Sequence, residues 1–189
     1  MNNSSEFSHE CSPEYSPDER RTVLRIAHDA ILSTLQGRKP EPVPFSQHLS
    51  EPRGAFATLY LKNELRGCVG HIAPNTPLEQ TVRDAARAAA FEDPRFPAVT
   101  IEEATRLKIE ISVLSPLQPI TPEQIVVGRH GLLISLRGRR GLLLPQVSVE
   151  HGWDRETFLE HTCHKAGLPP DAWRQDAKLE AFTAEVFSD

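Results

Sequence analysis

The hydrophobic positions of this 189-residue chain change their period several times, and each change predicts a new element. Apolar residues recur every three to four positions between Val23 and Leu35, after a capping box that begins at Ser16. This spacing predicts a helix over residues 17–36. The polar stretch before it, residues 1–15, predicts a flexible tail.

From Gly54 the period becomes two, which is typical of half-buried strands. Two strands meeting at the turn of residues 62–64 predict a β-hairpin, and its second strand carries residues 65–70. A second capping box, residues 76–79, predicts the start of an alanine-rich helix. Alternating apolar positions then predict a strand over residues 107–114.

The same order of elements recurs in the second half of the chain. The pattern predicts a hairpin, two helices and a last strand, over residues 132–144, 145–151, 154–166 and 179–187. We therefore predict a duplicated unit, with repeat one at about residues 53–115 and repeat two at about 125–187. Neither repeat can bury its sheet alone, so we expect one shared core within an α+β domain over residues 16–189.

Composition excludes several classes of protein. The formal net charge of −5 gives no electrostatic footprint for nucleic acid or an anionic membrane. No apolar run approaches the ~20 residues that cross a bilayer, and the N-terminal residues lack a signal-peptide core. The odd number of cysteines (Cys11, Cys68 and Cys163) favours free thiols in a reducing cytoplasm. No cofactor-binding motif is present, so we expect no cofactor.

Residues 65–70 (LRGCVG) hold the leading chemical candidate, Cys68. Arg66 is two positions away on the same strand, about 7 Å from Cys68, and a cation at that range favours thiolate over thiol. Gly67 and Gly70 leave room for a ligand or another backbone. Cys68 is then a nucleophile or thiolate ligand; alternatively it is a small buried core residue.

A nucleophilic cysteine needs a base and an orienting group. His130, which lies between two glycines at the entry to the second hairpin, is the candidate base, and Glu150 is the candidate that orients it or binds a substrate amine. The alternatives are a histidine that caps a turn and a carboxylate on a helix surface. Spacing does not show that Cys68, His130 and Glu150 meet.

Three further groups of polar residues are open to two interpretations each. Asp93 and Arg95 favour a salt bridge that fixes a loop, and otherwise line the mouth of a pocket. The helix period turns Cys163 inward and its histidine neighbours outward, which argues against a metal site. Four arginines near the second hairpin favour a solvated turn, with a patch for RNA, phosphate or an acidic partner as the alternative, at positions 129, 137, 139 and 140.

The chain resembles the AMMECR family, known in prokaryotes as AmmeMemoRadiSam system protein A. The resemblance spans about residues 20–187 and rests on stretches that follow in order at proper spacing. These are residues 65–70 (LRGCVG), 91–97 (FEDPRFP), 127–131 (VGRHG), 144–147 (LPQV), 150–154 (EHGWD) and 165–168 (KAGL). It implies an α+β fold in which the two repeats form one barrel-like, mostly antiparallel sheet. It also implies association with a Memo-like protein and a radical SAM protein.

Two functional hypotheses follow. In the first, which we favour, the protein is a binding or accessory component for those two partners, and Trp153 packs at an interface or binds substrate. In the second, it is a small enzyme that uses Cys68 in a cleft between the repeats, with His130 and Glu150 as further catalytic residues. Residues expected to bind substrate are Arg66, Gly67, Asp93, Arg95 and Trp153.

Overall fold

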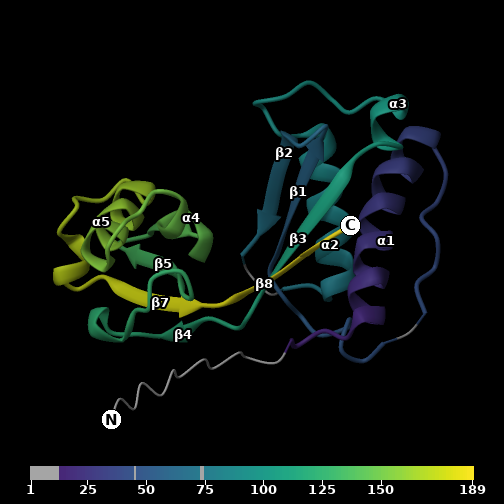
Figure 1. The fold of residues 1–189 in the computed structure, drawn as a ribbon. Helices are drawn as coiled ribbons and strands as arrows, with labels where there is room; N and C mark the ends of the chain where they lie inside the picture. Colours follow the sequence, from purple (N-terminus) through teal and green to yellow (C-terminus); the bar gives the residue numbers. More distant parts are fainter. Residues whose placement is uncertain (1–12, 45, 73–74) are drawn as a thin grey trace, which may run out of the picture.

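The computed structural model describes residues 13–44, 46–72 and 75–189, which form two lobes (Figure 1). Each lobe contains one four-stranded antiparallel sheet. The first lobe has the strand order β2-β1-β3-β8, and the second lobe has the order β4-β7-β5-β6. The mixture of helices with antiparallel sheets confirms the α+β class.

The elements follow the predicted order, except that the short strand β4 is additional and the predicted last strand is divided into β7 and β8. The first lobe contains α1 (Pro17–Gln36), β1 (Ala55–Leu61), β2 (Glu64–His71), α2 (Leu78–Phe91), α3 (Ile101–Ala104), β3 (Lys108–Leu114) and β8 (Ala184–Ser188). The second contains β4 (Gln118–Pro119), β5 (Gly131–Leu136), β6 (Arg139–Leu143), α4 (Pro145–Glu150), α5 (Arg155–Lys165), β7 (Lys178–Phe182) and two short 3₁₀ turns. Within the described ranges, no helix has both the length and the apolar content needed to cross a bilayer.

Helices α1 and α2 cover one face of the first sheet (Figure 1). The residues of β1 that point toward them are completely buried: Ala55, Ala57 and Leu59. Strand β3 adds Ile109 and Ile111 to the same core. Alanines on the inner side of α2 allow this helix, which was predicted to be rich in alanine, to approach the sheet closely.

The second lobe has a core of its own, in which α5 packs against β5 and β6. Phe158, Leu159 and Cys163 of α5 meet Leu132 and Ile134 of β5. The predicted single shared core and barrel-like sheet are therefore wrong. Each sheet stays open and is covered by its own helices, so each lobe buries its apolar face without the other.

The chain crosses between the two lobes twice, and each crossing ends in an edge strand. β3 belongs to the first sheet, but the chain continues into β4, which pairs with β7 of the second sheet. β7 in turn continues into β8, which pairs with β3. At the crossing, the Ser115 N–H donates to the Thr183 carbonyl at 2.9 Å, and the Thr183 N–H donates to Ser115 Oγ at 2.9 Å. The predicted last strand, residues 179–187, is thus two strands in different sheets, because the chain changes sheet at Thr183.

One helix start also differs from the prediction. α2 begins at Leu78 after Pro77, and no side chain caps it. The Thr76 hydroxyl lies 2.8 Å from the Thr81 hydroxyl, so it is bonded within the helix rather than to the backbone N–H of a capping box. The preceding loop replaces the missing cap, since the carbonyls of Leu49 and Glu51 accept from the first N–H groups of the helix.

One glycine in each of the two hairpins lies against a helix backbone. A Cβ on Gly67 of β2 would lie 2.1 Å from the Ala89 carbonyl oxygen of α2. A Cβ on Gly141 of β6 would lie 2.3 Å from the Ala166 nitrogen at the end of α5. Both glycines therefore allow a helix to approach a strand, which is the close approach expected for Gly67. The internal duplication itself stays a prediction.

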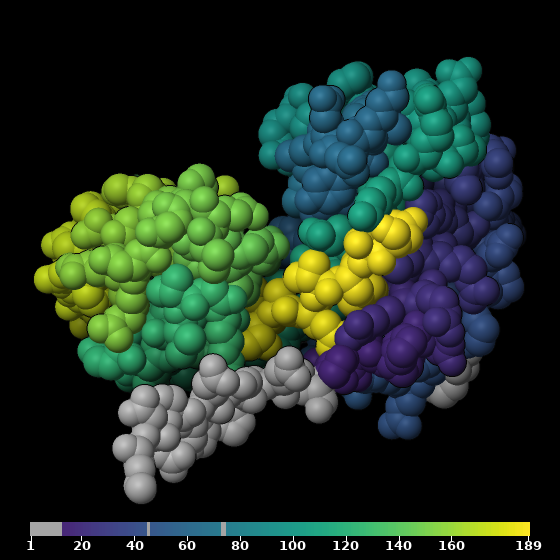
Figure 2. Space-filling model, in the orientation of Figure 1, coloured from purple at the N-terminus to yellow at the C-terminus, as the bar shows by residue number. Residues whose placement is uncertain are grey.

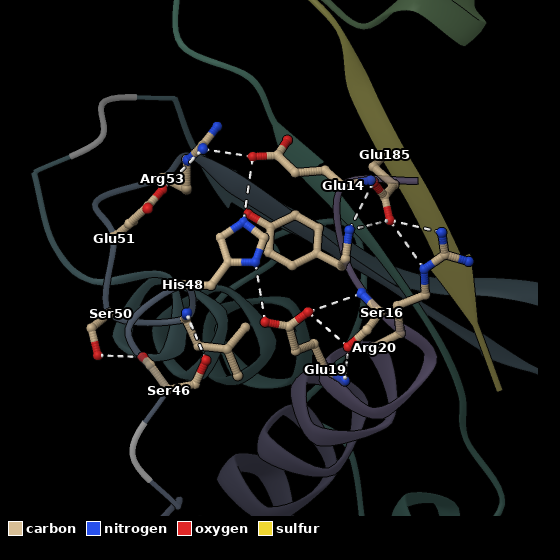
Figure 3. A network of polar contacts seen from close by, with 12 residues as sticks. Glu14, Ser16, Glu19, Arg20, Ser46, His48, Ser50, Glu51, Arg53 and Glu185 are labelled. Atoms are coloured by element: carbon tan, nitrogen blue, oxygen red, sulfur yellow. Dashed lines mark hydrogen bonds and ion pairs between the residues drawn. The ribbon is translucent and has the colours of Figure 1, made fainter. Parts of the chain in front are cut away.

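The N-terminal segment before α1 is bound to the first lobe (Figure 3). The backbone N–H groups of Glu14 and Tyr15 donate to the Glu185 carboxylate of β8, which also pairs with Arg20 at 2.9 Å. The Tyr15 ring stacks on His48 with ring centroids 4.5 Å apart. Glu14 and Tyr15 are therefore bound rather than part of a flexible tail, and residues 1–12 of that prediction lie outside the described residues.

We expect Tyr15→Phe to raise the free energy of unfolding by about 1 kcal/mol. Tyr15 is 1% exposed, and its hydroxyl has no hydrogen-bond partner among the described residues. Phenylalanine keeps the stacked ring and removes the unpaired polar group. Urea denaturation of the two proteins measures the difference. Lower stability for Tyr15→Phe would show that the hydroxyl is hydrogen-bonded in solution.

Candidate functional site

Cys68 lies on the face of the first sheet that is not covered by α1 and α2. Its register partner on β1 is Thr58, whose own partner on β3 is Glu110, so these three residues form one row across the sheet. The Thr58 hydroxyl donates to Cys68 Sγ at 3.3 Å. Cys68 is partly exposed, so the alternative that it is a buried core residue does not hold.

Asp93 and Arg95 bind the backbone of Cys68 from the outer edge of the sheet. The Cys68 N–H donates to Asp93 Oδ2 at 2.9 Å, and the Arg95 guanidinium donates to the Cys68 carbonyl at 3.3 Å. Their side chains also form a salt bridge, at 2.7 Å. Together they occupy the acceptor and donor positions that a neighbouring strand would offer to β2. They therefore close the edge at this residue and fix the strand that carries the thiol.

The Asp93 carboxylate is buried and strongly held in its ionised form. Hydrogen bonds from the Arg95 side chain are the largest cause that lowers its pKa well below the usual range, followed by the N–H groups of Cys68 and Arg95. Burial acts in the opposite direction and is outweighed. The predicted salt bridge is present, and its binding to the backbone of Cys68 is an additional role that spacing did not reveal.

Tyr60, a neighbour of Cys68 on the open sheet face, is influenced by charged groups from both lobes. It lies on the same face of β1 as Thr58. Burial, and then the charges of Glu110, Cys68 and Glu150, raise the pKa of the Tyr60 phenol. Glu150 belongs to α4 of the second lobe, so the tertiary structure places it within electrostatic range of the open sheet face. Figure 2 shows the surface hollowed between the two lobes, with β8 at the base of the hollow.

Arg66 lies at a β-bulge in β2, and its side chain is bonded to residues other than Cys68. The register shifts between Leu59 and Tyr60, which displaces Arg66 from regular alternation. Its guanidinium pairs with Glu103 at 3.1 Å and donates to the carbonyls of Pro97 and Ala98. These contacts tie β2 to the loop before α3. The cation that contacts the backbone of Cys68 is Arg95, which the sequence pattern did not connect with it.

His130 has the turn-capping contact that was the alternative to a catalytic base. The Val126 N–H donates to His130 Nδ1 at 3.2 Å. Burial, and then the positive charge of Arg129, lower the pKa of His130. Among the described residues, no hydrogen bond joins His130 to Cys68 or to Glu150. The structure therefore places Glu150 within electrostatic range of Tyr60, but it does not hydrogen-bond His130 to Cys68 or Glu150 among the described residues.

Trp153 lies in an aromatic stack on the second lobe. Its ring lies 4.7 Å from His151 and 3.9 Å from His161, with all three nearly parallel. Cys163 is buried in the core of this lobe, where burial raises the pKa of its thiol. In the part of the chain that the structure describes, no group of three or more His, Cys, Asp or Glu side chains is arranged to hold a metal ion. The substrate-binding role of Trp153 stays a prediction.

Comparison with known proteins identifies the family of this chain. The AMMECR1 family model matches residues 24–187. The chain belongs to the AMMECR1 family. The protein is 45% identical to Protein MK0488 of Methanopyrus kandleri, over 91% of this chain and 89% of that protein. It is 42% identical to Protein MJ0810 of Methanocaldococcus jannaschii, over 91% and 90% of the two chains.

A solved structure extends the likeness to three dimensions. The crystal structure of the uncharacterized protein PH0010 from Pyrococcus horikoshii matches this AMMECR1-family chain with a TM-score of 0.80. The two sequences are 44% identical, and the match covers 88% of this chain and 89% of that one. The names of these relatives state no activity, so the site has to be interpreted from its own geometry.

Proposed function

We propose that this AMMECR1-family protein is a binding component that holds a ligand or partner against the open face of the first sheet, around Cys68. The carrying observation is the combination of a partly exposed thiol with a backbone that Asp93 and Arg95 lock in place. A surface fixed before binding loses little conformational freedom when it binds, which favours affinity. The expected partners are those that the family resemblance implies, a Memo-like protein and a radical SAM protein.

The open face has the mixed chemistry of a binding surface. Thr58 and Cys68 offer a hydroxyl and a thiol, Tyr60 offers an amphipathic ring, and Glu110 and Glu150 offer carboxylates from two lobes. An exposed apolar side chain extends the surface, Val186 on β8, which lies in the same row as Ser112 of β3. A partner that enters between the lobes therefore meets polar and apolar groups together, as in the core and rim of an interface.

Substitution of the open face tests this proposal. We expect Thr58→Arg to reduce capture of purified Memo-like and radical SAM partners at least tenfold, because a long charged side chain would fill the space beside Cys68. The measurement is a pulldown with the full-length protein, with circular dichroism as the check of folding. Arg87→Glu, on the exposed side of α2, is the matched control. Equal capture by Thr58→Arg and Arg87→Glu would exclude the open face as the docking site.

A second candidate function rests on the Cys68 sulfur itself. In this alternative, the thiolate attacks the carbonyl carbon of an acyl substrate and forms a thioester, while the leaving group departs with the thiol proton. The partial exposure of Cys68 and its contact with the Thr58 hydroxyl favour it. The absence of a base bonded to Cys68 among the described residues favours the binding function.

The alkylation rate of Cys68 separates the two functions. If Cys68 is an activated nucleophile, iodoacetamide should modify it at pH 7 at least tenfold faster than it modifies glutathione, since only the thiolate reacts. Arg95→Ala should slow the reaction, and Arg87→Ala should leave it unchanged. Mass spectrometry of the Cys68 peptide gives the rate. A rate equal to that of glutathione in all three proteins would remove the enzymatic alternative.

A further inference from the structure

A groove of about 150 Å³ lies at the crossing of the two chain segments that join the lobes. We call it the hinge groove. Ser115 and Thr183, which bond to each other across the crossing, form one side, and Ile120 and His130 belong to the second lobe. None of its lining residues belongs to the Cys68 face, so it is separate from the site described above.

The apolar part of the hinge groove is rigid. Phe182 is 2% exposed and lies at the end of β7, opposite Gly131 of β5. A Cβ at Gly131 would lie 2.3 Å from the Phe182 ring, so the glycine is what allows the ring to pack on the strand. Pro116 and Pro119 supply further apolar surface with little conformational freedom. A flat apolar group can therefore enter without a large ordering cost.

His130 lines the same groove and carries a hydrogen-bond donor on its ring. Because the Val126 N–H donates to Nδ1, that nitrogen carries no proton, and the neutral ring holds its proton on Nε2. Burial and the charge of Arg129 lower the pKa of His130, which favours this neutral form at pH 7. No described residue accepts a hydrogen bond from Nε2. The groove therefore combines an apolar wall with a histidine whose N–H donates to no described residue.

We propose that the hinge groove is a binding site for a small, flat, uncharged ring that carries a hydrogen-bond acceptor, such as a lactam or a heteroaromatic ring. The volume sets the size, because a cavity of about 150 Å³ accommodates a molecule like benzene. Because Nε2–H is a donor, the ligand offers it a hydrogen-bond acceptor, which is a carbonyl oxygen or a ring nitrogen. The lining contains no Lys, Arg, Asp or Glu, which favours an uncharged ligand.

Titration of the full-length protein with 2-pyridone tests the proposal. We expect saturable NMR shifts of the Ile120 methyl groups and of the His130 ring nitrogens, with a dissociation constant on the order of 1 mM for so small a probe. Toluene has a ring of the same size but no acceptor, and it should bind at least fivefold more weakly. Ile120→Trp fills the groove without altering His130, and His130→Phe keeps a ring but removes the donor.

We expect each of these two variants to weaken 2-pyridone binding at least tenfold. Val126→Ala, a change to an exposed neighbour that keeps its backbone N–H, should bind as the wild type does. Three results would overturn the proposal: no saturable shift up to 20-fold above the expected dissociation constant, unchanged binding by Ile120→Trp, or equal binding of toluene and 2-pyridone. Unchanged binding by His130→Phe would exclude the Nε2–H contact.

Discussion

Gly67→Ala is expected to lower the free energy of unfolding by about 3 to 5 kcal/mol, a large part of the stability of an ordinary domain. The added Cβ would lie 2.1 Å from the Ala89 carbonyl oxygen, and this oxygen is part of helix backbone rather than a flexible side chain. The first lobe can relieve the clash only by moving α2 away from β2, which opens the core beneath.

Urea denaturation followed by circular dichroism measures this effect. Gly141→Ala should destabilise the second lobe in the same way, because its Cβ would meet the backbone at Ala166. Gly138→Asn is the control: Gly138 has φ +81° and no heavy atom within 4 Å of an added Cβ, and asparagine tolerates a left-handed backbone. A loss below about 1 kcal/mol for Gly67→Ala would show that α2 adapts easily and that the close approach is not required.

Asp93→Ala is expected to lower the free energy of unfolding by about 2 to 3 kcal/mol. The substitution removes the acceptor of the Cys68 N–H and the partner of Arg95 at once. We also expect Cys68 to become more accessible to alkylation, because the strand edge loses both of its side-chain contacts. Asp176→Asn, at an exposed position, is the matched control and should change neither quantity.

The lowered pKa of Asp93 predicts how the stability of the protein depends on pH. The pKa of Asp93 is lower in the folded protein than in the unfolded chain, so its contribution is fully present above the unfolded value of about 4. This contribution is lost as the pH falls below about 4 toward the folded value. The wild type should therefore lose stability on acidification more steeply than Asp93→Asn, in denaturation series between pH 6 and pH 2. Parallel curves for the two proteins would contradict the role assigned to Asp93.

The helices and the hairpins of this chain could be predicted because residues at short spacing determine them. The capping box at Ser16 and the apolar period after it placed α1 correctly. The change of period at Gly54 placed the first hairpin, and Gly67 was predicted to lie at a close approach. The start of α2 was predicted less well, since loop carbonyls rather than Thr76 satisfy its first N–H groups.

The candidate site was predicted in its residues but not in its contacts. Cys68, Asp93 and Arg95 were all singled out, yet the sequence did not connect the last two with the backbone of the first. The sequence pointed to no role for Tyr60, although burial and charges from both lobes raise the pKa of its phenol. His130 was predicted as a base or as a turn cap, and a single backbone hydrogen bond supports the cap.

The sequence by itself determined the family, the α+β class and the order of the helices and strands, because those depend on residue types at short spacing. Only the tertiary structure decided that there are two open sheets, and that the chain returns from β7 of the second sheet to β8 at the edge of the first. Strand pairing joins residues far apart in the sequence, and the alternation that marks a strand is the same for every possible partner. The pattern of residues 179–187 could therefore predict a strand, but not that it changes sheet at Thr183.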